Sequence, residues 1–534
     1  MEVTLPLFPK TDDLCKRIKL PILSTVSPVT SFGVQKINCK NDDLSFCHVC
    51  HAFLSSNCKH DNEKWECSIC GNKNKFINSS VSQEQIKNQN YEIILKSQND
   101  GGIIFGIYLS LGFSQQDFVR AKLSCISILR HLPESSRVII FLGTDQCPYV
   151  LLVPPKDQSE LDENFVKSDT SHFPHIHIET SKVASIARFA SIETMIGIDL
   201  SNLFFTNKTI SAAERTIEKL TLLSNKMECP STIEIVGTLS RVLSGTPLHF
   251  ISIVDQINQS PSFVDMIHSF PVRLDFLVAH YTKTIHQLYP NHQGTIQVIS
   301  MENPIEQSSQ LLLQKTTFQV MTKVRSSRSA VEWHKPLKHA TIEGSIIFSP
   351  VCICSEQPFT LEIRTLPNQD FYNFQIVTKY VICEDTKTNF YLRVMNYSFA
   401  SSTNFDDIVQ RINWNCVLWH WSKSILTKVH NEAINSINKM SEVMQSVYKS
   451  ETLLNAISLF PDLWITSNDI MKRFIGTELL LYSKPSEIGF IKEEESKRYV
   501  RTPNGTLENN EKKDVEEEMP LLPIYVPIRT CDGK

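Results

Sequence analysis

Short apolar runs that alternate with helical patterns fill the middle of the chain. The runs "IIFGIYLSLG", "RVIIFLG", "LHFISIV", "VRLDFLVAH" and "GTIQVIS" are each long enough for one strand. Between the first two runs, Phe118, Ala121, Ile126 and Leu129 recur at near-helical spacing. Strands of consecutive apolar residues that alternate with helices predict a mostly parallel sheet covered on both faces. We expect this α/β trunk over residues 91–300.

The pattern changes near residue 301, where helical spacing gives way to period-2 alternation. The segments "FTLEIRTL", "YNFQIVTKYVICE" and "FYLRVMNYSF" are rich in β-forming residues, and they predict an antiparallel β-sandwich over residues 301–402. Residues 1–40 contain short mixed runs such as "KLPILSTV", which are typical of strands and loops. We expect this N-terminal segment to contribute to the same sandwich.

Helical spacing returns over residues 403–490, where a helical domain is predicted. Trp414 and Trp421 are seven positions apart and share one helix face. This face is either a core stripe or a groove for a partner. The polar segment "NSSVSQEQIKNQN" is interpreted as a linker, and residues 491–534 form a charged tail that we expect to be disordered.

Length, charge and missing motifs exclude several classes of function. At 534 residues the chain is too long for one core, and its net charge of -4 argues against a general nucleic-acid binder. No run approaches the roughly 20 apolar residues that span a bilayer, and the N-terminus does not resemble a signal peptide. Neither a glycine-rich phosphate-binding motif nor a nucleophile elbow occurs. We therefore expect a cytoplasmic protein that is not an enzyme.

Five of the 15 cysteines lie between residues 47 and 70. Cys47 and Cys50, then Cys67 and Cys70, form two C-x-x-C pairs with the spacing of a four-cysteine zinc site. Two such pairs close a tetrahedral shell and leave no position for water, so the predicted zinc, one ion, is structural. The alternative is four unrelated buried thiols. The remaining Cys58 and the nearby His48, His51 and His60 are not needed as ligands.

Two further sets of residues have side-chain types that occur in metal sites. In "HIHIET", His175, His177 and Glu179 would face the same side of a strand, either as a metal site or as a polar exposed face. Tyr108 and Ser110 stand where a metal-dependent adhesion domain would need Asp and Ser, so we expect no magnesium there.

Several stretches resemble the inner-coat subunits of the COPII vesicle coat. The stretch "CHVCHAFLSSNCKHDNEKWECSICGNKNKF" is similar to the zinc ribbon of that family, including Trp65 and Asn74. The stretch "LKHATIEGSIIFSPV" resembles the start of its β-sandwich. Two further matches favour the GTPase-activating member over the cargo-adaptor member. They are the strand pair at Phe374–Tyr380 and Leu392–Val394, and the helical motif at Ser458–Leu463.

The resemblance implies a divergent member with a multidomain α/β fold. Its parts would be a zinc ribbon at residues 41–78, a von Willebrand A-like trunk, a β-sandwich and a helical domain. It implies ER-to-Golgi protein transport as a peripheral protein of the endoplasmic reticulum membrane and of COPII vesicles. The implied partners are the GTP form of the coat-recruiting small GTPase, the cargo-adaptor subunit as heterodimer partner, and outer-coat subunits.

One feature departs from that family. Its GTPase-activating subunit carries an arginine finger in an R-[FY]-P-x-P-R context within a gelsolin-like domain, and this context does not occur here. Arg498, Arg501 and Arg529 are candidates by residue type alone. The alternative function is therefore a non-catalytic scaffold or regulator of coat assembly that has lost GTPase activation.

Overall fold

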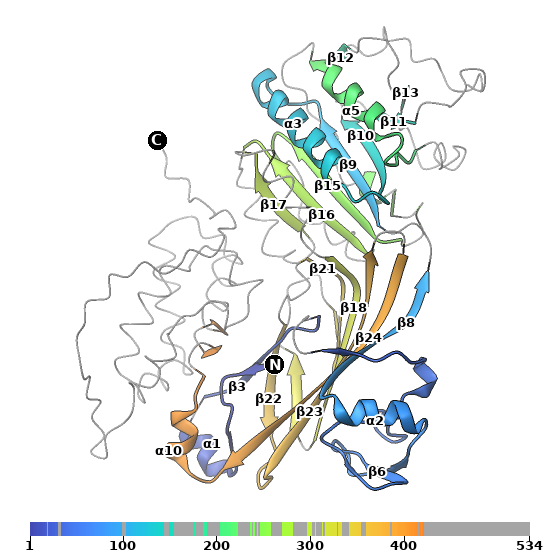
Figure 1. Cartoon of the computed structure of the whole chain (residues 1–534). Helices are drawn as coiled ribbons and strands as arrows, with labels where there is room; N and C mark the ends of the chain where they lie inside the picture. Colours follow the sequence, from blue (N-terminus) through green and yellow to red (C-terminus); the bar gives the residue numbers. More distant parts are fainter. Residues whose placement is uncertain are drawn as a thin grey trace, which may run out of the picture.

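The chain folds into several sheets with few helices, so the predicted multidomain α/β class is confirmed (Figure 1). The trunk sheet with its helices lies at one end of the described region, and the β-rich region with the ribbon lies at the other (Figure 1). Besides short pieces between residues 176 and 420, this computed structural model describes residues 1–18, 20–29, 34–98, 103–143, 149–153, 203–222, 246–257, 270–280, 296–301, 316–327, 329–333, 341–353, 359–384 and 387–413.

The trunk contains a seven-stranded sheet that is parallel over five adjacent strands. All five apolar runs form these parallel strands, as predicted. At one side of the sheet, β11 pairs antiparallel with β10 and with the edge strand β13, and the sequence patterns did not reveal these two strands. In sheet order the strands are β13 (Ser185–Arg188), β11 (Tyr149–Leu152), β10 (Arg137–Gly143), β9 (Ile104–Ser110), β15 (Leu248–Val254), β16 (Val272–Val278) and β17 (Ile296–Ser300).

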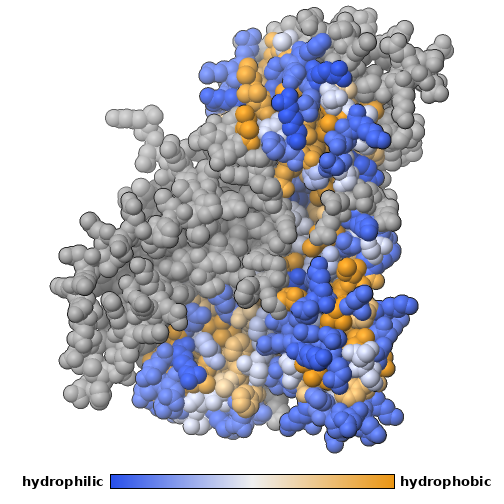
Figure 2. Space-filling view, viewed as in Figure 1, coloured by the Kyte–Doolittle hydropathy of each residue, from blue (hydrophilic) through white to orange (hydrophobic). Residues whose placement is uncertain are grey.

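Both faces of the trunk sheet are buried, because alternate residues of each strand enter different cores. Ile107 and Leu109 of β9 pack on the face that α3 (Gln115–His131) and α5 (Ile210–Lys219) cover. Tyr108 packs on the opposite face. Hydrophilic residues are prominent on the outer surface at this end of the molecule (Figure 2).

A buried polar group lies where the trunk meets the β-rich region. Asp275 on β16 accepts hydrogen bonds from His249 on β15 at 2.6 Å and from Arg273 at 2.8 Å. Arg273 also donates to the hydroxyl of Thr316, the first residue of strand β18 (Thr316–Ser326) in the neighbouring sheet, at 2.7 Å. Burial and the adjacent guanidinium lower the pKa of His249. A neutral imidazole therefore lies beside the ion pair that joins the two regions.

Two sheets form the β-rich region. The eight-stranded sheet consists of β20 (Thr341–Glu343), β21 (Ile346–Ile353), β18 (Thr316–Ser326), β23 (Phe371–Glu384), β24 (Lys387–Ser402), β8 (Asn90–Gln98) and β4 (Gln35–Lys36), with β2 (Phe8–Pro9) beside β24. The four-stranded sheet consists of β1 (Glu2–Val3), β3 (Ile22–Val26), β22 (Phe359–Thr365) and β19 (Ser329–Trp333). Both sheets contribute to one large core, together with α1 (Asp12–Ile18) and α10 (Phe405–Gln410).

The expected start of the trunk at residue 91 differs from the structure. Strand β8 pairs with β24 and β4, so it belongs to the eight-stranded sheet. The burial of β8 differs from that of a trunk strand. Tyr91 and Ile93 are buried, whereas Ile94 is exposed. By contrast, every residue of β9 is buried, as in a central strand of a doubly covered sheet.

The segment interpreted as a linker is a helix, and that interpretation was wrong. Helix α2 (Ser79–Lys87) begins after Asn78, whose side chain accepts a hydrogen bond from the N–H of Val81. Its inner face is polar yet buried: Gln85 donates to the carbonyl of Ser45 at 3.2 Å and to the hydroxyl of Tyr91 at 2.8 Å. Its two apolar residues, Val81 and Ile86, pack against different cores and are five positions apart, so the hydrophobic pattern shows no helical stripe.

Most of the predicted helical domain at 403–490 and the tail at 491–534 lie outside the described residues. Trp414 and Trp421 lie outside them as well, whereas Trp419 is described and fully buried. Among the helices that the structure describes, none is long and apolar enough to cross a membrane.

We expect Gly106→Ala to destabilise the trunk. A Cβ at Gly106 would lie 2.3 Å from the ring of Phe250 on the neighbouring strand. Overpacking of this kind costs about 1–3 kcal/mol. The check is urea denaturation of Gly106→Ala in the wild-type and in a Phe250→Leu background. The cost should shrink in the second background, and an equal cost in both would contradict the proposed clash.

Candidate metal centre

The ribbon is built on two turns with the same backbone pattern. In the first, the N–H of His51 donates to the carbonyl of Cys47 at 2.8 Å, and in the second the N–H of Gly71 donates to that of Cys67 at 2.8 Å. Both His51 and Gly71 adopt left-handed backbone conformations, with φ of 55° and 74°. A left-handed residue after each C-x-x-C pair turns the chain sharply, so that both thiols of a pair point the same way.

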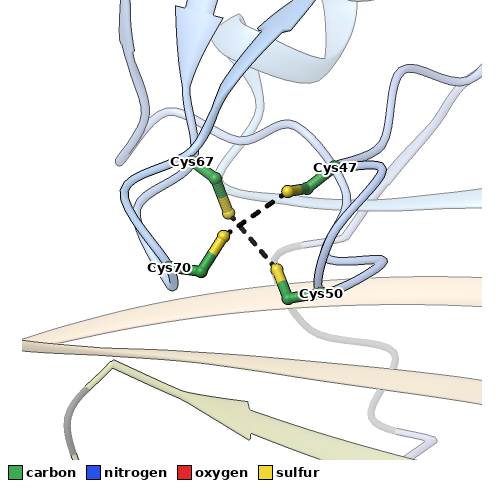
Figure 3. A group of neighbouring side chains, drawn as sticks. All are labelled: Cys47, Cys50, Cys67 and Cys70. Atoms are coloured by element: carbon green, nitrogen blue, oxygen red, sulfur yellow. Dashed lines mark hydrogen bonds between the residues drawn. The ribbon is translucent and has the colours of Figure 1, made fainter.

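The two turns bring all four predicted cysteines together (Figure 3). The sulfurs of Cys47 and Cys70 are 3.5 Å apart, those of Cys50 and Cys67 are 3.6 Å apart, and all four lie within 4.8 Å of one another. For zinc bound to sulfur at about 2.3 Å, sulfurs at the corners of a tetrahedron are about 3.8 Å apart. The cluster could therefore bind a zinc ion.

The other candidate ligands in this stretch lie outside the cluster. The thiol of Cys58 is buried and contacts the hydroxyls of Ser55 at 3.6 Å and Ser68 at 3.7 Å. One ring nitrogen of His48 lies 3.2 Å from the side-chain amide of Asn72.

Trp65 and Asn74 lie on adjacent strands of the ribbon, whose sheet consists of β5 (Lys59–His60), β6 (Lys64–Glu66) and β7 (Lys73–Lys75). The side chain of Asn74 accepts from the N–H of His48 at 3.2 Å and donates to the carbonyl of Asn72 at 2.9 Å. It thereby ties the first turn to the second. Trp65 is buried in the ribbon core beside them.

A cation from the eight-stranded sheet supports the cluster, and the sequence did not reveal it. The Nε of Arg325 on β18 donates to the carbonyl of Cys50 at 3.0 Å. Burial lowers the pKa of Arg325, while Cys50 and Cys67 act in the opposite direction. One of its terminal nitrogens is buried without a hydrogen-bond partner in the described structure. Because four thiolates around Zn²⁺ carry a net negative charge, a guanidinium here suits an occupied site.

The thiols differ in how readily they ionise. Burial opposes ionisation of Cys47, yet the N–H groups of Cys50 and Val49 outweigh it and lower its pKa to about 7. Burial raises the pKa of Cys50 to about 11 and raises that of Cys67 further. Because metal ligands must be thiolates, filling this site releases protons.

The ribbon is joined to the sheet by side chains of β23. The amide of Gln375 both accepts from the N–H of Phe53 at 2.7 Å and donates to its carbonyl at 2.8 Å. Asn373 donates to the carbonyl of Ser68 at 3.3 Å. The second turn and the residue that follows the first turn by two positions are thus hydrogen-bonded to the same strand.

The remaining candidate residues are placed only in part. His177 lies on β12 (Ile176–His177), which pairs with β14 (Thr221–Leu222), while His175 and Glu179 lie outside the described residues. Tyr108 is buried in the trunk, and the hydroxyl of Ser110 accepts from the N–H of Gly112 at 3.1 Å. Arg498, Arg501 and Arg529 also lie outside the described residues.

The fold is similar to that of solved structures. No family model and no curated protein matches the sequence. The human COPII-coat protein Sec24c matches with a TM-score of 0.66 and 10% identity, over 91% of this chain and 74% of that one. Two further structures score lower. A von Willebrand factor type A protein from Catenulispora acidiphila has a TM-score of 0.37 and 10% identity, over 73% of this chain and 84% of that one. The ArnB paralog VWA2 from Sulfolobus acidocaldarius has a TM-score of 0.34 and 10% identity, over 71% of this chain and 90% of that one. The chain therefore has a Sec24-like fold.

The two left-handed positions should respond oppositely to substitution. Gly71→Ala places a Cβ in a conformation that costs roughly 1 kcal/mol or more, although it clashes with nothing within 4 Å. His51→Gly relieves the same cost in the other turn. Amide hydrogen exchange of the ribbon, followed by mass spectrometry, should therefore be about fivefold faster in Gly71→Ala and slower in His51→Gly. Faster exchange in both variants would contradict this account.

Proposed function

We propose that this protein is a component of a COPII-type vesicle coat, acting in ER-to-Golgi protein transport as a cytoplasmic, peripheral protein of the endoplasmic reticulum membrane. The observation that carries the proposal is the fold match to the COPII-coat protein Sec24c along 91% of the chain. Membrane contact in this proposal is electrostatic, between basic side chains and anionic lipid, and needs no anchor.

In this proposal the protein works by association and has no catalytic site of its own. It binds the GTP form of the coat-recruiting small GTPase, pairs with the cargo-adaptor subunit and meets outer-coat subunits. Support comes from the strand pair that resembles the GTPase-activating member. Its two stretches, Phe374–Tyr380 and Leu392–Val394, face each other in the β23–β24 pair, where Lys379 lies opposite Leu392, Thr378 opposite Arg393 and Val377 opposite Val394. Activation of GTP hydrolysis on the partner is part of the same proposal.

A second candidate function is a scaffold that binds coat partners without activating the GTPase. The observation that favours it is the absence of the R-[FY]-P-x-P-R context from the sequence. An arginine finger stabilises the charge that develops on the transferred phosphoryl group and contributes about 10³–10⁵ in rate.

The two functions are separated by measuring binding and hydrolysis together. The purified chain should bind the coat-recruiting GTPase loaded with a non-hydrolysable GTP analogue and should not bind the GDP form. Single-turnover hydrolysis of GTP should then be faster with the chain than without it. Binding to the GTP form without faster GTP hydrolysis would support the scaffold function. Binding to neither nucleotide form would overturn the coat proposal. Circular dichroism of the purified chain checks that it is folded, so that a failure to bind either form can be interpreted.

We also propose that the ribbon holds one structural zinc ion. After dialysis against a mild chelator, the chain should retain about one zinc. Cys67→Ser should lose it, whereas Cys58→Ser, in the same ribbon core but outside the cluster, should keep it. Zinc retained in Cys67→Ser would contradict the assignment.

The zinc affinity should fall as the pH is lowered. The raised pKa values of Cys50 and Cys67 keep both thiols protonated in the metal-free ribbon at neutral pH. Binding therefore displaces at least two protons, and each displaced proton weakens apparent affinity about tenfold per pH unit of acidification. Competition with a chromophoric chelator at pH 6.5 and 7.5 measures the change, and a pH-independent affinity would contradict it.

A further inference from the structure

Three potential metal ligands meet in the trunk, at the end of the molecule away from the ribbon (Figure 1). Asp117 lies in the first turn of α3, Asp255 directly follows β15, and His280 follows β16 by two residues. One ligand atom of each lies within 4.8 Å of the other two. The three residues are far apart in the sequence, so no local spacing could indicate the site.

The fold explains why these residues converge. Strands β9, β15 and β16 are parallel neighbours, and the chain leaves each of them at the same edge of the sheet. The chain connects β9 to β10 on one side of β9, while β15, β16 and β17 lie on the other side. The order reverses between β9 and β15, and open α/β sheets bind ligands outside the carboxyl ends of the strands at such a point.

The spacing of the three ligand atoms suits a small divalent cation. The Nε2 of His280 is 3.4 Å from Oδ2 of Asp117 and 3.6 Å from Oδ1 of Asp255. For zinc bound to nitrogen or oxygen at about 2.0–2.1 Å, the corners of a tetrahedron lie roughly 3.3–3.4 Å apart. These two separations are close to those of ligands around one ion, and they are longer than ordinary hydrogen bonds.

Hydrogen bonds hold all three ligand residues in place. The hydroxyl of Ser114 donates to Oδ2 of Asp117 at 2.6 Å, and the same hydroxyl caps α3. The backbone N–H of His280 donates to the carbonyl of Asp255 at 2.9 Å, which keeps these two residues side by side. Hydrogen bonds of this kind to ligating carboxylates orient metal ligands.

The competing explanation is an ion pair between a protonated His280 and the two carboxylates. Among the described residues, Arg120 also approaches Asp117; its side chain is exposed, and its Nη1 lies 3.9 Å from Oδ1 of Asp117. Carboxylate oxygens that lie within 4.8 Å of each other repel, and a divalent cation would offset that repulsion.

We infer that Asp117, Asp255 and His280 form a second metal site, which binds a divalent transition-metal ion of the zinc type through two carboxylates and one imidazole. Three protein ligands leave a coordination position open, unlike the closed shell of the ribbon. The side chain of His280 is 63% exposed, so the open position is accessible to water or to an anionic group of a ligand. The site does not depend on the proposed coat function.

The test uses the full chain with its ribbon zinc in place. Equilibrium dialysis against micromolar Zn²⁺ should add one ion per chain, and His280→Ala and Asp255→Asn should each weaken its binding at least tenfold. His131→Ala is the matched control, because His131 is an exposed histidine at the other end of α3. Circular dichroism checks that all variants fold.

Cobalt(II) gives a second, spectroscopic readout. Co²⁺ added to the zinc-loaded chain should give weak visible absorption without the intense near-ultraviolet band of cobalt bound to thiolate, because the site has no sulfur ligand. His280→Ala should abolish the visible absorption. Binding of no ion beyond the ribbon zinc, or equal binding by wild type and His280→Ala, would overturn the proposal and leave His280 as an ion-pair partner.

Discussion

The pairing of β23 with β24 is the constraint on which the other parts of the described structure depend. Its register runs without a break from Phe371 opposite Ala400 to Glu384 opposite Lys387. Alternate side chains of β23 serve different neighbours: Ile376 enters the core between the two sheets, whereas Gln375 binds the ribbon. Because side chains alternate with a period of two, a shift by one residue would exchange these roles. One register therefore positions ribbon and sandwich together.

The parts predicted well from sequence are those whose physical cause is local. Central parallel strands are buried on both sides, so each shows as a continuous apolar run, and β10 and β15 begin and end where those runs do. The four cysteines are likewise found by spacing, because each turn needs only a few consecutive residues. The residues that complete the ribbon are distant: Arg325 and Gln375 follow it by about 275 and 322 positions.

The parts that were missed depend on tertiary partners. Helix α2 has no apolar stripe, since its buried Gln85 is satisfied by Ser45 and Tyr91 from elsewhere in the chain. In the sequence, the cluster of Asp117, Asp255 and His280 is visible only as two polar residues, Asp255 and His280, that follow apolar strands. That pattern indicates an edge of the sheet, but the contribution of Asp117 from α3 emerges only when the topology is known.

The order of strands makes the trunk an insertion within another domain. The chain leaves the eight-stranded sheet after β8 and returns to it at β18, and these strands are separated by β24 and β23. The end of β8 and the start of β18 lie at the same level across the sheet. Lys96 is opposite Phe390, Phe390 is opposite Val381, and Val381 is opposite Phe318. Three strand spacings are about 14 Å, which roughly five extended residues can span. The sandwich and ribbon thus form a host whose covalent continuity would survive replacement of the whole trunk by a short loop.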